Sequence, residues 1–81
     1  MDFPCDYPVK VIGFSSDTFE ADIVAVFEQH CGKITDAMIK KNPSKKGNYV
    51  SVTVTIQATG EAQLQTLFAE LKAIDGIKMV L

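Results

Sequence analysis

The chain has 81 residues, of which 47% are hydrophobic and 22% are charged, and its formal net charge is −2. This length allows one domain, residues 1–81, and the composition is typical of a folded globular protein rather than a disordered one. The eight basic residues are all lysines. Arginine, the usual bidentate ligand of phosphate and carboxylate groups, is therefore absent from the sequence.

Cys5 and Cys31 are the only cysteines, and neither belongs to a CxxC motif. We therefore expect two free thiols in a reducing compartment. The first residues have no basic region followed by an apolar run, which argues against a signal peptide. No apolar run approaches the ~20 residues that span a membrane, so we expect a cytoplasmic protein without membrane contact.

Residues 8–14 alternate in polarity and are rich in β-branched side chains, which predicts a strand. If Lys10 faces solvent, Val9 and Val11 face the core and Ile12 lies on the open face of the sheet. Gly13 is expected to end the strand, and residues 15–17 form a polar turn.

Residues 18–30 carry an apolar stripe at helical spacing, which predicts a helix. Asp17 or Ser16 is the expected N-cap, with Glu20 as the capping-box acid if Asp17 caps, and Gly32 is the expected stop. The stripe consists of Phe19, Ile23, Val26, Phe27 and His30.

Residues 33–41 are interpreted as a second strand, with Ala37 and Ile39 on one face and Met38 disturbing the alternation. Turn-forming residues over 42–48 then predict an antiparallel hairpin. The following ten residues, 49–58, alternate without interruption and are the clearest strand. Its expected inward side chains are Val50, Val52, Val54, Ile56 and Ala58.

Residues 61–74 predict a second helix, capped by Thr59 or Gly60 and ended by residues 75–76. Its apolar stripe consists of Leu64, Leu67, Phe68 and Leu71. Residues 77–81 predict a last strand with two alternating sets of side chains. Lys78 and Val80 form the set that is expected on the open face. The other set is Ile77, Met79 and Leu81.

Two helices and four strands that are each apolar on one side bury those sides best as two layers, which is an α+β arrangement. Right-handed connections then give a ferredoxin-like βαββαβ sandwich with both helices on one face. The expected sheet is four-stranded and antiparallel, with strand order 4-1-3-2.

Several segments resemble the YbeD-like family of small bacterial proteins, and the match as a whole extends over nearly the entire chain. The matching runs are residues 3–13, 43–52, 55–59, 67–71 and 74–81. The resemblance implies a ferredoxin-like fold close in shape to the ACT regulatory domains that bind small effectors. It carries no functional residues over to this chain.

No group of residues predicts catalysis, a cofactor or a metal. His30 and Cys31 are neighbours on one helix and point about 100° apart, so they do not form a nucleophile and base. Three acidic residues, Asp17, Glu20 and Asp22, are explained by the dipole of the helix that they begin. One histidine, two distant cysteines and scattered carboxylates lack the spacing of metal ligands.

Two candidate sites remain, and each has an ordinary structural alternative. The junction of the first strand and first helix (Gly13, Ser15, Ser16) is where ACT-like domains bind effectors. Its alternative is an ordinary capped turn. A second group is a candidate contact for an anion or a partner, or else a solvated hairpin that protects a sheet edge. That group consists of Lys40, Lys41, Lys45, Lys46, Asn48 and Tyr49.

The open face of the sheet, with Ile12, Phe14 and Val80, is a candidate surface for homodimer formation or for another protein. We therefore expect a non-catalytic regulatory or interaction module that binds a small effector or a protein partner. The alternative is a weak binder of RNA or other single-stranded nucleic acid through the sheet face and the lysine-rich hairpin. The negative net charge and the missing arginine disfavour it. Acylphosphatase, which shares this topology, needs an arginine after the first strand and is excluded.

Overall fold

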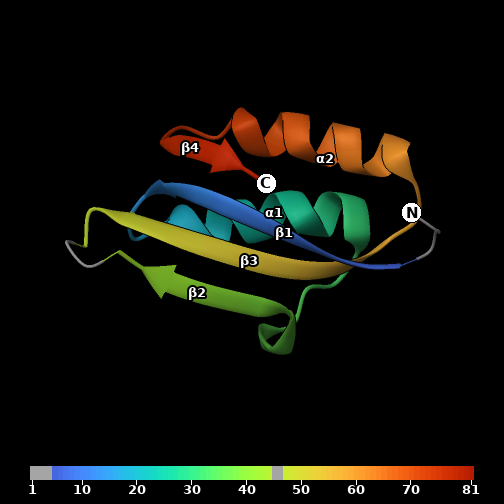
Figure 1. Ribbon diagram of the computed structural model, residues 1–81, viewed down its shortest axis with the longest axis horizontal. Helices are drawn as coiled ribbons and strands as arrows, with labels where there is room; N and C mark the ends of the chain where they lie inside the picture. Colours follow the sequence, from blue (N-terminus) through green and yellow to red (C-terminus); the bar gives the residue numbers. More distant parts are fainter. Residues whose placement is uncertain (1–4, 45–46) are drawn as a thin grey trace.

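The computed structural model describes residues 5–44 and 47–81. Its four strands form one antiparallel sheet in the order β2-β3-β1-β4, as Figure 1 shows. The predicted strand order and ferredoxin-like βαββαβ fold are thereby confirmed. The elements are β1 (Cys5–Phe14), α1 (Phe19–Cys31), a 3₁₀ turn (Asp36–Met38), β2 (Ile39–Pro43), β3 (Tyr49–Ala58), α2 (Glu61–Lys72) and β4 (Ile77–Val80).

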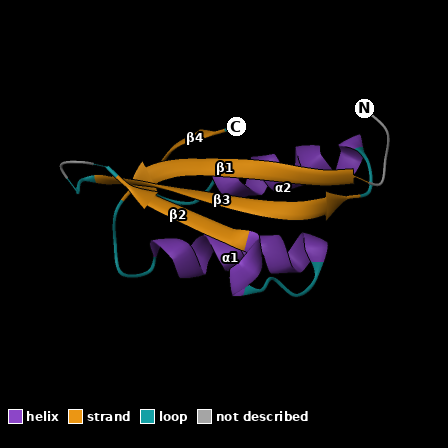
Figure 2. Cartoon of the chain, turned by 60° about the horizontal axis from the view of Figure 1, so that its bottom comes forward, coloured by secondary structure: helices purple, strands orange, loops and turns teal. Residues whose placement is uncertain are grey.

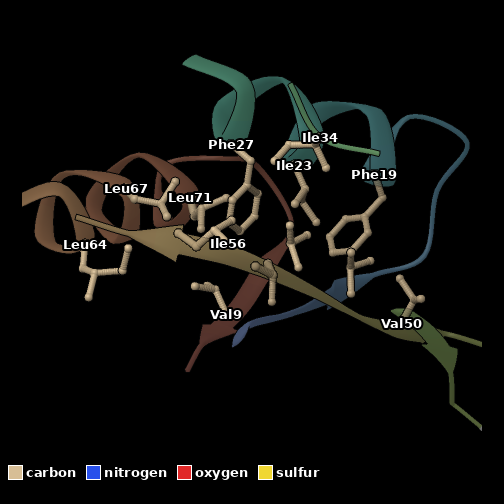
Figure 3. Close-up of a cluster of buried hydrophobic side chains, with 14 residues drawn as sticks. Val9, Phe19, Ile23, Phe27, Ile34, Val50, Ile56, Leu64, Leu67 and Leu71 are labelled. Carbon is tan, nitrogen blue, oxygen red and sulfur yellow. The ribbon is translucent and has the colours of Figure 1, made fainter. Parts of the chain in front are cut away.

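Both helices bury their apolar stripes against one face of the sheet, so that helices and strands form two layers. Figure 2 shows α1 running along the strands, and α2 lies beside β4. Side chains from both helices and the two central strands meet in a single core, as Figure 3 shows. The largest fully buried members include Phe27 and Ile23 from α1, Leu67 and Leu71 from α2, and Ile56 from β3. The predicted inward row of β3 is buried without exception.

The first strand is longer than predicted and runs straight through Pro8. Lys10 N–H donates to Leu81 O at 3.1 Å, and Leu81 N–H donates back to Lys10 O at 2.8 Å. Because residues two apart in a strand turn their backbone groups to the same side, the nitrogen of Pro8 faces that side too. There it lies beyond the end of β4, so its missing N–H leaves no gap in the ladder with β3.

The second predicted strand, residues 33–41, is wrong in its position. Residues 36–38 form the 3₁₀ turn, and β2 begins only at Ile39 and ends at Pro43. Ala37 is exposed, whereas Ile34, which was not assigned to the core, is buried. The short apolar run imitates alternation, but the chain leaving α1 must first cross from the helical layer to the sheet edge.

Neither predicted N-cap of α1 occupies the cap position. Thr18 takes that position and makes no side-chain hydrogen bond to the helix. Glu20, expected as a capping-box acid, instead lies 4.0 Å from the Nζ of Lys41 on β2. The predicted stop is confirmed, since Gly32 has a φ of 78° and its N–H donates to the Glu28 carbonyl.

At the end of the last strand, the side chains that face the core and those that face solvent are the reverse of the predicted ones. Val80 pairs with Val11 and Met79 with Ile12, but the register shifts before the next pair, Gly13 with Ile77. This β-bulge places one extra residue in β4, which breaks the alternation. Ile77 and Val80 therefore both pack on the core, while Met79 lies on the open face and is 49% exposed. The prediction that Val80 lies on the open face was wrong.

Candidate functional site

A pocket of about 250 Å³ lies where the β1–α1 connection meets the end of β2. Ser15 and Ser16 line it from the connection, which is the location predicted for a ligand. The Ser15 N–H donates to the carbonyl of Asn48 at 3.0 Å and so ties the connection to the β2–β3 hairpin. The remaining lining residues come from α1, β2 and β3, and they are Phe19, Glu20, Lys41, Pro43 and Val50. We call this cavity the helix-side pocket.

The helix-side pocket carries opposite charges on two elements. Lys41 Nζ and Glu20 Oε2 are 4.0 Å apart, and their side chains are 53% and 45% exposed. An ion pair this exposed contributes little to stability, because water screens it and two long side chains must be held in place. Both groups therefore remain accessible to a ligand that brings a complementary charge.

Gly13 is a structural residue rather than part of the helix-side pocket. It is buried, and a Cβ atom placed on it would lie 2.6 Å from the Gly76 carbonyl oxygen and 2.6 Å from Cε1 of Phe19. Sequence reasoning placed a ligand at this glycine because glycine lets other groups approach the backbone closely. Here the group that approaches is the protein's own Phe19 ring.

The lysine-rich segment does not form one surface. Lys40 pairs with Thr53 and Lys41 with Val52, so their side chains lie on opposite faces of the sheet. Lys41 belongs to the helix-side pocket, and Lys40 belongs to the open face. Lys45 and Lys46 lie outside the described residues.

The other two members of that predicted group take separate roles. Asn48 accepts the hydrogen bond from Ser15 through its backbone carbonyl. Tyr49 on β3 stacks on Phe14 of the adjacent strand β1, with ring centroids 5.0 Å apart. The sequence predicted Phe14 on the open face and Tyr49 on the neighbouring strand, but their stacking depends on the β1–β3 register, because the two residues are 35 positions apart.

His30 and Cys31 tie the two helices together and do not face one another as a catalytic pair. His30 Nε2 contacts Glu70 Oε2 on α2. The side-chain amide of Gln63 donates to the His30 carbonyl at 3.2 Å and lies 3.8 Å from the Cys31 sulfur. Burial raises the pKa of the Cys31 thiol, which favours its protonated form over the nucleophilic thiolate.

Within residues 5–44 and 47–81 there is neither a metal-binding cluster nor a membrane-spanning helix. No three histidine, cysteine or acidic side chains are grouped so as to hold a metal ion. Among the same residues, no helix has both the length and the apolar character needed to cross a membrane.

Comparison with known structures identifies the same fold in proteins of distant sequence. The solution structure of protein HP0495 from H. pylori has a TM-score of 0.77 at 20% identity, covering 100% of this chain and 85% of that one. The crystal structure of the ACT domain from GTP pyrophosphokinase of Chlorobium tepidum has a TM-score of 0.73 at 18% identity, covering 95% and 97%. Both likenesses show the fold, and the second confirms its ACT-like shape.

Sequence comparison identifies full-length relatives. The UPF0250 protein of Shewanella amazonensis is 40% identical over 81 residues, covering 100% of this chain and 90% of the relative. Those of Shewanella loihica and of a Janthinobacterium species are 41% and 37% identical, with 90% and 89% of the relative covered. A family model described as "Protein of unknown function (DUF493)" matches residues 1–81. These matches confirm the resemblance to YbeD-like proteins, and the chain belongs to this DUF493 family.

Proposed function

We propose that this domain is a non-catalytic regulatory module that binds a small zwitterionic effector, of the size of an amino acid, in the helix-side pocket. The observation that carries the proposal is the placement of Lys41 and Glu20 at 4.0 Å beside two serine side chains in one cavity. A ligand with a carboxylate and an ammonium group would satisfy both charges at once.

The size of the helix-side pocket supports a small ligand. Its volume of about 250 Å³ is below the roughly 300–1,000 Å³ typical of pockets for drug-sized molecules. Phe19 offers an apolar surface, and the hydroxyl groups of Ser15 and Ser16 offer hydrogen bonds. The likeness to the ACT domain of a GTP pyrophosphokinase agrees with a regulatory role.

The proposed setting is the cytoplasm. Cys31 is a free thiol, and free thiols persist in reducing compartments.

Thermal unfolding in the presence of single amino acids and related zwitterions at 10 mM tests the proposal. A ligand present at ten times its dissociation constant stabilises the folded state by ~1.4 kcal/mol. For a domain of this size, that raises the unfolding midpoint by about 5–10 °C. We expect one class of chemically similar zwitterions to raise the unfolding midpoint by this amount.

Two adjacent lysines provide the matched control. Lys41→Ala should abolish the shift, because it removes the cation of the helix-side pocket. Lys40→Ala, one residue away on the opposite face, should leave the shift intact. The proposal fails if no zwitterion raises the midpoint, or if both variants respond to it equally.

A further inference from the structure

The open face of the sheet carries the large apolar side chains that the described part of the chain leaves in solvent. Phe14 is 48%, Tyr49 37%, Met79 49% and Leu81 57% exposed. All four lie on this face. Phe14 and Tyr49 are partners of each other outside the buried rows of β1 and β3. Met79 is the partner of Ile12, and Leu81 is the partner of Lys10, both of which also lie outside the buried row of β1. We call these four residues the open-face patch. Gathered on one surface, they mark a place of contact with another molecule.

Two members of the open-face patch form a flat aromatic surface. The rings of Phe14 and Tyr49 stack at 5.0 Å with planes inclined by 28°. Lys78 Nζ lies 5.3 Å from the centroid of Phe14 and 5.8 Å from that of Tyr49. This lysine covers the rings through a cation–π contact that is weak at an exposed site, so a flat ligand can displace it. The released ammonium group then stays within reach of a nearby anion.

A shallow hollow of about 270 Å³ adjoins this aromatic surface. Tyr49 forms part of its wall, and Asn42, Ser44 and Ser51 bring polar groups to it. Asn42 is exposed and pairs with Ser51, which places its amide on the open face with a donor and an acceptor available. A flat heterocycle with polar edges is the ligand that such a surface suits. Pro43 and Val50 also line this hollow, as they line the helix-side pocket.

The charges of the two layers differ in sign, and this separates the candidate occupants. Lys10, Lys40 and Lys78 lie on the open face, where Asp6 is the one acidic side chain among the described residues. The other described carboxylates lie on the two helices and on the segments between helices and sheet. A second copy joined face to face would bring lysines against lysines. An anionic partner instead gains from every one of them.

We propose that the open face binds single-stranded nucleic acid, with one base stacked on Phe14 and Tyr49 and the phosphates held by Lys78 and Lys40. Base-on-aromatic stacking combined with backbone neutralisation is the general mode of sequence-tolerant single-strand binding. The net charge of −2 gave the opposite expectation, because it averages over two faces of unlike charge. This site is separate from the helix-side pocket and does not depend on the proposed function.

Fluorescence anisotropy with fluorescein-labelled octauridylate and octathymidylate, at 50 and 200 mM salt, tests the proposal. The intact chain should bind at least one of the two, and their ratio distinguishes RNA from DNA as the preferred source of the bases. Phe14→Ala and Tyr49→Ala should each weaken binding about tenfold, which corresponds to ~1.4 kcal/mol for a lost stacking contact. Tyr49→Phe should restore most of the affinity.

Lysine variants on and off the open face distinguish binding at this site from nonspecific electrostatic attraction of the oligonucleotide to the protein. Lys78→Ala should lower the salt dependence, measured as log K against log salt, by about 0.7. Lys72→Ala on α2 and Lys41→Ala in the helix-side pocket should leave both affinity and slope nearly unchanged. Circular dichroism and the thermal midpoint show that each variant is folded, as expected for exposed positions.

Four results would overturn the proposal. The first is that neither oligonucleotide binds at 50 mM salt, and the second is that Tyr49→Ala binds both as tightly as the intact chain does. The third is equal displacement of the oligonucleotide by poly-L-glutamate, which would identify an acidic polypeptide as the partner. The fourth is a dimer in sedimentation equilibrium that Phe14→Ala dissociates, which would show that a second copy covers this face.

Discussion

Gly13 shows how one missing side chain fixes the relation between three elements. It lies on β1, where the Phe19 ring from α1 and the Gly76 carbonyl before β4 both approach its α-carbon. Only a residue without Cβ leaves room for the two together. The same contact positions the start of α1, and with it the helix-side pocket.

Gly13→Ala should therefore destabilise the fold by about 2–3 kcal/mol, because the added methyl group meets a buried ring and a backbone oxygen. In urea denaturation the midpoint should fall with the slope unchanged. Gly60→Ala is the control: its φ of 169° is ordinary extended backbone, and nothing lies within 4 Å of the new Cβ. Its effect should stay below about 1 kcal/mol. Equal stability of the two variants would contradict the close packing at Gly13.

At the scale of elements, the end of β4 is one place where pattern and structure diverge. Strict alternation placed Met79 inward and Val80 outward, and the bulge opposite Ile12 and Gly13 reverses both. A bulge depends on which partner strand is present and where its glycine lies, so β4 alone contains no signal for it. The bulge also turns Lys78 and Met79 together toward the open face, where the proposed nucleic-acid site lies.

Serine substitutions at two consecutive positions of β4 test this phase. Val80→Ser should cost about 1–2 kcal/mol, since it removes apolar contact with the core and brings a hydroxyl there. Met79→Ser should change the free energy of unfolding by less than about 0.5 kcal/mol, as exposed positions usually do. Thermal or urea unfolding of both variants measures the difference. If Met79→Ser destabilises the protein more than Val80→Ser, β4 alternates without a bulge and Met79 faces the core.

At the scale of the whole molecule, one stretch of the central strand β1 has no neighbour on one side among the described residues. On the side away from β3, the described residues pair with β1 only from Lys10 onward. An unpaired row of N–H and C=O groups invites another strand, and proteins block such edges with proline and charge. Pro8 removes one donor from this row, and Asp6 places a charge in it.

Pro8→Val should expose this edge and make the chain self-associate. We expect sedimentation velocity to show a dimer at concentrations at least tenfold lower than for the unaltered chain. Thr55→Val is the matched control, because Thr55 is the partner of Pro8 on β3 and gains the same side chain without a new N–H. If both variants associate equally, the added apolar surface rather than the freed donor is responsible.

The sequence was enough to predict the layers, the strand order and the β3 register, because each depends on an apolar period repeated over many residues. It failed over residues 33–38, where a short run imitated a strand. The candidate sites were harder to predict. Ser15 and Ser16 line a pocket, and their binding of a ligand stays a prediction, but pairing Lys41 with Glu20, or Phe14 with Tyr49, requires the tertiary register. Neighbouring lysines looked like one cluster because a linear sequence does not show alternate faces.

Pro43 and Val50 pair across β2 and β3, and each contributes to the wall of both cavities, one on each side of the sheet. This residue pair is thus a wall that the two cavities share. A molecule in either cavity that displaced this pair would alter the shape of the other. Thermodynamic reciprocity would then make each occupant change the affinity of the other by the same factor, with no hinge or second domain required.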